Sequence, residues 1–348
     1  MSPLNAALAF ALAALLSYVL TLGQSRLAVR FGFLDVPDAR RKHEGLRPRL
    51  GGPGLLIAFC TAALLAGYGW NSKFAVLLAA ACALVGIGAI DDKRVPRFHE
   101  LPASVQLLAQ LGAAGLAILG GIYIVDVRDP TAPAPFGGVL HLPLWAAVIA
   151  TLFWIAGMIN TVNLLDGMDG LAGGVAAIAA AVLGLVSLRL GQTDVAILCF
   201  ALAGAACGFL PHNLSRSHTF MGTSGAWFLG FMLAALSIVG GAKLATALLV
   251  VGVPVLDVAL LILLRSLRHQ PFWQGDRSHL FHRLLDVGLS PGATLLLYCS
   301  ISAVFGLFAF VFTSNSSIGL GLKIYGLVGL VLVMALLLGM LTRRGTTR

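Results

Sequence analysis

Eleven long apolar runs divide this chain of 348 residues and leave only short polar segments between them. A helix that crosses a bilayer needs about 20 predominantly apolar residues. Runs that meet or approach this length lie near 4–29, 51–70, 73–90, 103–125, 144–162, 170–190, 194–211, 224–241, 243–264, 293–313 and 319–341. Hydrophobic residues make up 59% of the sequence and charged residues only 11%, which excludes a water-soluble enzyme. The sequence therefore predicts an all-α, polytopic membrane protein with about eleven transmembrane helices and one domain over 1–348.

Basic residues are distributed unequally between the two predicted sides of the membrane. The side that follows the first run receives 18 of the 23 Lys and Arg residues. The positive-inside rule places this side in the cytoplasm, with the N-terminus outside and the C-terminus cytoplasmic. The predicted cytoplasmic loops lie near 30–50, 91–102, 160–170, 212–223 and 265–292. Next to lipid, the net charge of +9 is interpreted as a topology signal, so we expect no nucleic-acid partner. Most acidic residues fall on the same side as the basic ones, so the active site should face the cytoplasm.

Two adjacent carboxylates, Asp91 and Asp92, end the third apolar run. Such a pair is repulsive at a membrane surface unless a cation or a basic group neutralises it. One interpretation is a divalent metal site or a general base. The other is a solvated helix end paired with Lys93 and Arg94. This segment alone leaves both open.

A second acidic group follows the fifth run, where Asn163, Asp166 and Asp169 occur at intervals of three residues. A helix here would align their oxygens on one face, about 5–6 Å apart. Such oxygens suit Mg²⁺ or Mn²⁺, which is often held by one or two carboxylates, waters and a substrate phosphate. The alternative is two Asp-Gly turns between adjacent spans. The loop contains no basic residue to balance the two aspartates, which favours a metal.

The loop near 265–292 combines basic, histidine and aromatic residues, and it contains Arg265, Asp276, His279 and His282. The spacing of the two histidines lets both face one phosphate from a single helical turn. Zinc is not expected, because no Cys or Glu stands at a suitable spacing. Binding of an anionic substrate and contact with anionic lipid headgroups both remain open.

Asp257 lies inside an apolar run, about two turns before Arg265. A carboxylate at the bilayer centre costs about 2.5–3.5 kcal/mol on insertion scales. Asp257 is therefore expected to be either functional or paired with Arg265.

Taken in order, these segments resemble the polyprenyl-phosphate N-acetylhexosamine-1-phosphate transferases, membrane enzymes that begin bacterial surface-polysaccharide and peptidoglycan assembly. The likeness extends from about 26 to 292. The most specific motif is the run Asn-Leu-Leu-Asp-Gly-Met-Asp-Gly-Leu-Ala that begins at Asn163, and the weaker motifs are 35–43 with 48–52, Asp91-Asp92, 220–222, 228–230 and 271–284. Eleven spans, and Pro254 with Asp257, favour the branch resembling the undecaprenyl-phosphate GlcNAc-1-phosphate transferases that start O-antigen or common-antigen synthesis.

The resemblance implies a reaction at the bacterial inner membrane: transfer of a sugar-1-phosphate from a UDP-N-acetylhexosamine to undecaprenyl phosphate, with release of UMP. It also implies Mg²⁺ or Mn²⁺ and contact with membrane lipids, and it leaves a homodimer open. Asp91 or Asp92 would be the base and position the lipid phosphate, while Asp166 and Asp169 would hold the metal. The substrate-binding residues implied are Lys42, His43, Asn163, Arg265, Asp276, His279 and His282.

Four positions depart from the family pattern: Thr223 stands in place of a metal-binding Asp, His218 in place of Lys, Phe281 in place of His, and Glu100 in place of Lys. Two explanations compete, a divergent transferase and a degenerate, inactive homologue that binds lipid phosphate or nucleotide. The persistence of Asp92, Asn163, Asp166 and Asp169 favours the transferase. A lipid or sugar transporter is a third possibility, but it predicts ionisable residues deep in several spans, and only Asp257 fits.

Overall fold

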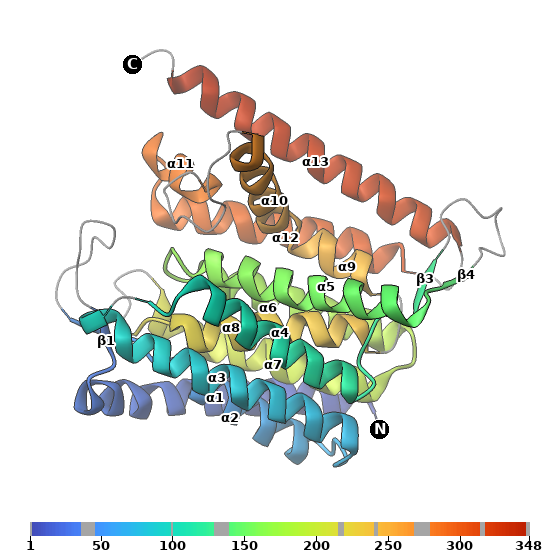
Figure 1. Ribbon diagram of the computed structural model, residues 1–348. Coiled ribbons are helices and arrows are strands. Elements are labelled where there is room, and N and C mark those ends of the chain that lie inside the picture. Colours follow the sequence, from blue (N-terminus) through green and yellow to red (C-terminus); the bar gives the residue numbers. More distant parts are fainter. Residues whose placement is uncertain are drawn as a thin grey trace.

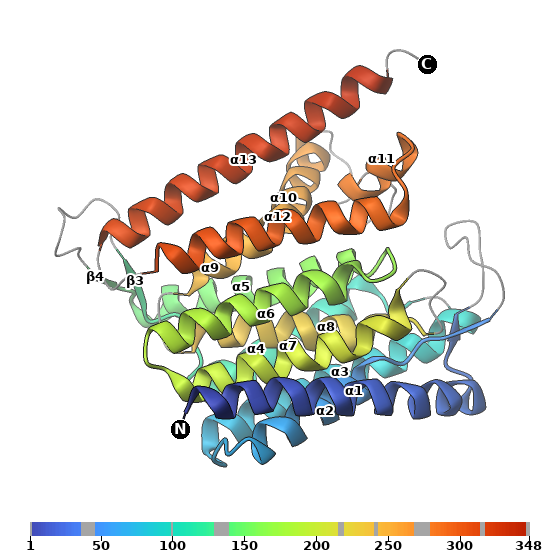
Figure 2. The ribbon, with the colours of Figure 1, turned by 180° about the vertical axis from the view of Figure 1, so that it is seen from behind.

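The computed structural model describes residues 2–35, 46–98, 100–128, 139–214, 219–239, 243–267, 279–313 and 317–345. Within these residues it is a bundle of helices with two small antiparallel β-ladders (Figures 1 and 2). The helices are α1 (Pro3–Phe31), α2 (Gly52–Leu65), α3 (Ser72–Phe98), α4 (Ala103–Leu119), α5 (Leu144–Leu165), α6 (Leu171–Arg189), α7 (Thr193–Asn213), α8 (Gly222–Ile238), α9 (Leu244–Val250), α10 (Gly252–Leu267), α11 (Leu280–Asp286), α12 (Pro291–Val311) and α13 (Ser317–Gly345).

Each of the eleven apolar runs forms a helix, and the ninth run is divided into α9 and α10 with a bend of 84°. In the described parts of the chain, α1, α3, α5, α6, α7 and α12 are long and apolar enough to cross a membrane. The bent pair would make a seventh span. The other apolar helices, α2, α4, α8 and the segment Leu322–Leu338 of α13, are shorter. The all-α, polytopic membrane fold is therefore confirmed, whereas the number eleven stays a prediction.

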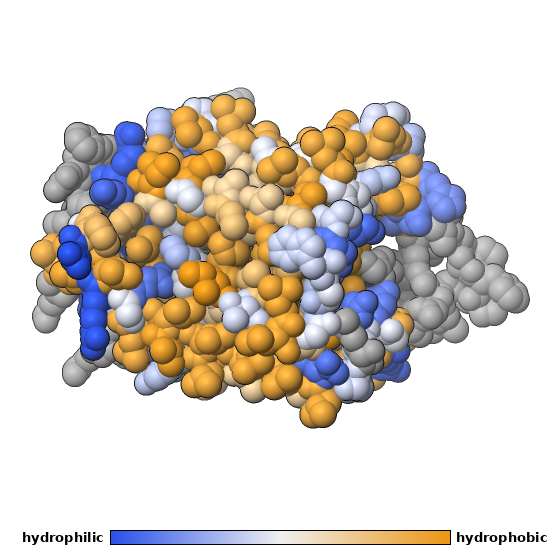
Figure 3. Space-filling view, turned by 90° about the horizontal axis from the view of Figure 1, so that it is seen from below, coloured by the Kyte–Doolittle hydropathy of each residue, from blue (hydrophilic) through white to orange (hydrophobic). Residues whose placement is uncertain are grey.

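The surface and the path of the chain are those of a membrane-embedded bundle. Hydrophobic residues dominate the middle of the face in Figure 3, and hydrophilic residues gather toward its two ends. The helix α1 begins at one end of the bundle and α13 finishes at the other (Figure 1), as an odd number of crossings requires. Which end faces the cytoplasm stays a prediction, as does the single-domain organisation.

The tightest helix pair described, α1 with α7, is built from small residues. The buried face of α1 includes Ala6, Ala9 and Ala13, and α7 presents Gly204 and Gly208 to it. A Cβ atom on Gly208 would collide with the carbonyl group of Ala14. Helices in lipid gain little from hydrophobic burial against one another, so close backbone packing through small residues holds such pairs together.

The helix α8 lies at the centre of the bundle, and every one of its residues is buried. Glycines let its first turn approach α2 and α3. A Cβ atom on Gly88 of α3 would lie 2.6 Å from Ser224 Cα, and one on Gly52 of α2 would lie 2.6 Å from the Ser224 carbonyl carbon. This close packing sets the N-terminus of α8 directly against the end of α3 that carries Asp91 and Asp92.

The chain between α1 and α2 is tied to the segment before α8. Strand β1 (Leu34–Asp35) pairs with β2 (Arg47–Pro48), and Arg49 then forms a parallel bridge with Phe220. The Phe220 N–H donates to the Pro48 carbonyl at 2.8 Å, and the Gly51 N–H donates to the Met221 carbonyl at 2.9 Å. These bonds carry Arg49 to the start of α8.

The second ladder joins β3 (Asp126–Arg128) to β4 (Val139–His141). It lies at the end of the bundle where α1 begins (Figure 1).

We expect Gly208→Ala to lower the free energy of unfolding by about 1–3 kcal/mol, because the added methyl group overpacks the α1–α7 contact. The matched control is Gly115→Ala in α4, where a Cβ atom meets nothing within 4 Å. That change should leave stability unchanged or raise it by up to about 1 kcal/mol. Thermal unfolding of the purified variants in detergent measures both. Equal losses would show that the α1–α7 contact is not close-packed.

Candidate active site

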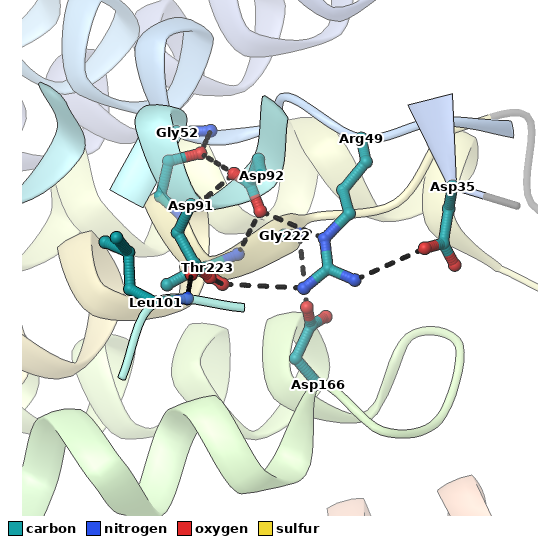
Figure 4. Close-up of polar contacts among 10 residues, drawn as sticks. Asp35, Arg49, Gly52, Asp91, Asp92, Leu101, Asp166, Gly222 and Thr223 are labelled. Carbon is teal, nitrogen blue, oxygen red and sulfur yellow. Dashed lines mark hydrogen bonds and ion pairs between the residues drawn. The ribbon is translucent and has the colours of Figure 1, made fainter. Parts of the chain in front are cut away.

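The centre of the site is the buried carboxylate of Asp92, which is 0% exposed. Its Oδ1 accepts hydrogen bonds from the Thr223 N–H at 2.8 Å and from Arg49 Nε at 2.9 Å. Its Oδ2 accepts from the Ser224 N–H at 3.1 Å and from Ser224 Oγ at 2.7 Å (Figure 4). Asp92 therefore caps the N-terminus of α8, where free N–H groups and the helix dipole stabilise a negative charge.

The neighbouring carboxylate of Asp91 is also 0% exposed and turns to other partners. It accepts from the Leu101 N–H on one oxygen and from Thr223 Oγ1 on the other, the latter at 2.6 Å. The alternative of a solvated helix end paired with Lys93 and Arg94 is therefore wrong, because both carboxylates are buried and their partners come from other segments.

Arg49 supplies the positive charge at this point, and sequence reasoning did not assign it a role. Its Nε bonds to Asp92, its Nη1 lies 3.5 Å from Asp35 Oδ1, and its Nη2 lies 3.4 Å from Thr223 Oγ1 (Figure 4). Burial lowers the pKa of Arg49, but the carboxylates of Asp92, Asp35 and Asp166 raise it, and the net shift is upward. The only available signal was its position in the motif 48–52.

Gly222 links the two acidic groups that the sequence predicted separately. Its N–H donates to Asp166 Oδ2 at 3.1 Å, and a Cβ atom on Gly222 would lie 2.6 Å from Asp92 Oδ1. Its φ of 73° also favours glycine. Although Asp166 is partly exposed, desolvation raises its pKa to about 8, against the attraction of Arg49.

The predicted helical row of Asn163, Asp166 and Asp169 is wrong in its local structure, because α5 ends at Leu165. Asn163 lies in the last turn of α5, whereas Asp169 lies in the following turn, and both are partly exposed. That turn closes at Gly170, whose φ is 76° and whose N–H donates to Asn213 Oδ1 at 3.0 Å. The loop itself contains no basic residue, but one lies beside it in the fold: Arg47 Nη1 is 3.7 Å from Asp169 Oδ2.

The helix α11 brings part of the last predicted loop to the same place. Phe281 is 3% exposed, and its ring packs against Gly167, where an added Cβ atom would lie 2.8 Å from Cζ. His282 lies beside Phe281, with ring centroids 4.2 Å apart. Before α11, His279 pairs with Asp257 at 2.9 Å between Nδ1 and Oδ2. Among the described residues Asp257 does not pair with Arg265, so that alternative is wrong, and its functional role stays a prediction.

Segments from all five predicted loops therefore meet at one end of the bundle, joined by the contacts of Arg49, Asp92, Asp166 and Phe281. Arg265 lies in the last turn of α10, and Glu100 is exposed next to the end of α3. Four of the residues named from the sequence, Lys42, His43, His218 and Asp276, lie outside the described residues.

The oxygens near Gly222 differ in their capacity to bind a metal. Asp91 and Asp92 are fully buried and hydrogen-bonded, and the described residues include no group of three or more His, Cys, Asp or Glu side chains arranged to hold an ion. Asp166 and Asp169 remain partly exposed. Mg²⁺ is commonly bound by one or two carboxylates together with substrate phosphates. The donor set therefore fits a metal that binds together with a phosphate-containing substrate.

The fold and this site define a polytopic helical membrane protein in which Arg49, Asp91, Asp92 and Asp166 gather at one end of the bundle. Residues 74–241 match the model of glycosyl transferase family 4. The chain is 32% identical to the decaprenyl-phosphate N-acetylglucosaminephosphotransferase of Mycobacterium tuberculosis (strain ATCC 25618 / H37Rv), over 82% of this chain and 77% of that protein.

Two further relatives give the same picture. The chain is 29% identical to the probable undecaprenyl-phosphate N-acetylglucosaminyl 1-phosphate transferase of Bacillus subtilis, over 88% of this chain and 84% of that protein. It is 28% identical to the undecaprenyl-phosphate alpha-N-acetylglucosaminyl 1-phosphate transferase of Escherichia coli O157:H7, over 80% and 76%. The chain belongs to this family of polyprenyl-phosphate N-acetylhexosamine-1-phosphate transferases.

We expect Arg49→Met to destabilise the protein by about 3–5 kcal/mol, because it leaves the buried charge of Asp92 without its counter-ion. The control is Arg47→Met, which removes a more exposed ion pair and should cost about 1 kcal/mol or less. Thermal unfolding in detergent compares the two variants. A loss for Arg49→Met no greater than that for Arg47→Met would contradict the role of Arg49 as the central counter-ion.

Proposed function

We propose that this protein transfers an N-acetylhexosamine-1-phosphate from a UDP-sugar to undecaprenyl phosphate and releases UMP, at the cytoplasmic face of the bacterial inner membrane. The product would start a cell-surface polysaccharide. The observation that carries the proposal is the convergence of Asp91, Asp92, Asp166 and Asp169 at one end of a bundle in a chain of this family.

In the proposed reaction an oxygen of the lipid phosphate forms a bond to the β-phosphorus of the UDP-sugar. The bond from that phosphorus to the oxygen shared with the α-phosphate breaks, and UMP leaves with this oxygen. Asp92 accepts four hydrogen bonds, which fix its carboxylate in place and support it as the group that positions the lipid phosphate. Asp91 accepts only two hydrogen bonds and so keeps more capacity to accept a proton, which supports it as the base.

The substrate phosphates would be held by groups from several loops. We assign Asn163 and Arg265 to this task because both are partly exposed at the ends of helices that reach this region. Lys42, His43, His279 and His282 are assigned to phosphate contacts, and Asp276 to orienting the last loop, on the strength of the family motif.

Mg²⁺ or Mn²⁺ bound by Asp166 and Asp169 would supply positive charge that stabilises the departing UMP. Arg49 adds a permanent charge beside the same carboxylates, since it interacts with Asp166 as well as with Asp92. Arg49 and the metal ion that Asp166 and Asp169 would hold would therefore share the neutralisation of the diphosphate.

A second candidate function is binding of lipid phosphate or nucleotide without turnover. Two observations favour it. Thr223 supplies a hydroxyl donor to Asp91 where the family pattern has a carboxylate, and Phe281 places an apolar ring against Gly167 where that pattern has a histidine.

The deciding measurement is UMP release by the purified protein with undecaprenyl phosphate, Mg²⁺ and a panel of UDP-N-acetylhexosamines. We expect release that requires the lipid and falls on the order of 100-fold in Asp169→Asn, the effect typical of losing one electrostatic group in an active site. Asp194→Asn, an exposed acid in the first turn of α7, is the control and should retain activity. No release with any donor would reject the transferase in favour of the binding function.

The substitution at Thr223 has a separate test that needs no turnover. In Thr223→Asp a carboxylate replaces the hydroxyl that lies 2.6 Å from Asp91 Oδ2, so the variant should unfold at a lower temperature in EDTA. Mg²⁺ should restore part of this loss, because an ion that binds only the folded state stabilises it. The native chain should respond little to Mg²⁺ in the absence of nucleotide. An equal response of both proteins would show that Thr223 does not limit metal binding.

A further inference from the structure

We propose that Asp257 is a positioning residue that fixes His279 in the orientation in which its Nε2 meets a substrate phosphate. The inference rests on the proposed function and deepens it. It assigns a role to a carboxylate inside a predicted membrane helix whose partner the sequence left undecided.

The first observation is the way Asp257 uses both of its oxygens. Oδ2 lies 2.9 Å from His279 Nδ1, and Oδ1 accepts the Leu280 N–H at 3.0 Å. One carboxylate on α10 therefore holds both the histidine ring and the first residue of α11. Asp257 is 6% exposed and His279 is 9% exposed, so the pair is largely removed from water.

The second observation is the cost of placing a carboxylate there. An acidic group within a membrane helix is unfavourable unless it is paired, and such groups usually mark functional positions. Among the described residues Asp257 is not paired with Arg265, two turns further along the same helix. The fold instead directs Asp257 to a histidine at the start of α11.

The third observation connects this pair to the acidic loop. Phe281 lies two residues after His279 and packs against Gly167, which stands between Asp166 and Asp169 in that loop. The rings of His279 and Phe281 are nearly parallel, with an interplanar angle of 11° and centroids 6.0 Å apart. The contact of Phe281 thus fixes the distance of α11 from the acidic loop, while Asp257 fixes the rotation of His279.

The chemistry follows from which nitrogen is occupied. With Nδ1 bound to Asp257, Nε2 is the nitrogen left for a ligand, and it makes no hydrogen bond within the described residues. The carboxylate also compensates the charge of an imidazolium, whose Nε2–H can donate to a phosphate oxygen. An aspartate that holds a histidine in one tautomer and orientation is a recurrent device in enzymes.

The test compares Asp257→Asn, His279→Gln and the double variant in the UMP-release assay. Asn keeps a carbonyl oxygen for the Leu280 N–H and removes the charge, so α11 should stay anchored. We expect each single variant to lower kcat/KM about 10- to 100-fold, as loss of one hydrogen bond to a charged group predicts. The double variant should be no worse than His279→Gln, because Asp257 acts through His279.

The matched control is Asp126→Asn. It changes an Asp–His pair of the same kind, with His141, that is exposed and belongs to the ladder of β3 and β4. This variant should keep full activity. Asp257→Asn with unchanged kcat/KM, or a double variant whose loss is the product of the single losses, would overturn the proposal.

Two readouts separate failure of this inference from failure of the proposed function. Binding of UMP by calorimetry requires no turnover, and Asp257→Asn should weaken it while Asp126→Asn should not. Nitrogen NMR of histidine-labelled protein should show the His279 Nδ1 signal shifted in Asp257→Asn. A native chain that binds UMP without releasing it from UDP-sugars would reject the transferase alone. UMP binding that Asp257→Asn leaves intact would reject the positioning role.

Discussion

The burial of one carboxylate, that of Asp92, organises the polar end of this protein. A charge with no exposure is tolerated only where several donors replace water, and here the N-terminus of α8, Ser224 and Arg49 provide them. Three of the four donors come from the first turn of α8, and the fourth, Arg49, comes from the segment after β2. Satisfying Asp92 therefore requires α3, α8 and the segment after β2 to meet at one point, and the glycines at 52, 88 and 222 make that approach sterically feasible.

The remaining site depends on this junction. Once Gly222 lies against Asp92, its N–H can reach Asp166, so the loop after α5 is drawn to the start of α8. Phe281 then packs on the same loop through Gly167, and Asp257 anchors α11 behind it. The polar residues thus form a chain of contacts in which buried groups hold the frame, and the partly exposed Asn163, Asp166 and Asp169 remain available to a substrate.

Much of this arrangement could be predicted from the sequence, for physical reasons that also set its limits. Long apolar runs report membrane helices directly, and the acidic motifs identified the loops that meet. The hydrogen-bond and ion-pair partners of these side chains could not be predicted, because the spacing of residues along the sequence does not show which distant segments come into contact. Arg49 was assigned no role because its neighbours Asp35, Asp92 and Thr223 come from separate parts of the sequence. For Asp257 the sequence left a functional role and a pair with Arg265 open, and its partner is His279. The helical row from Asn163 failed because α5 ends at Leu165, and Asp166 and Asp169 lie in the turn that follows.

The replacement at 223 can be understood through the charge balance of the same junction. Asp35, Asp92 and Asp166 interact with one guanidinium, that of Arg49, and Thr223 contributes a hydroxyl that donates to Asp91 and lies 3.4 Å from Arg49. A carboxylate at this position would place a second acidic group directly against Asp91, and a bound cation would relieve the repulsion. Threonine removes that repulsion, so the frame of this protein can form without a metal. In the proposed reaction, Arg49 and an ion that binds with the nucleotide would supply the positive charge.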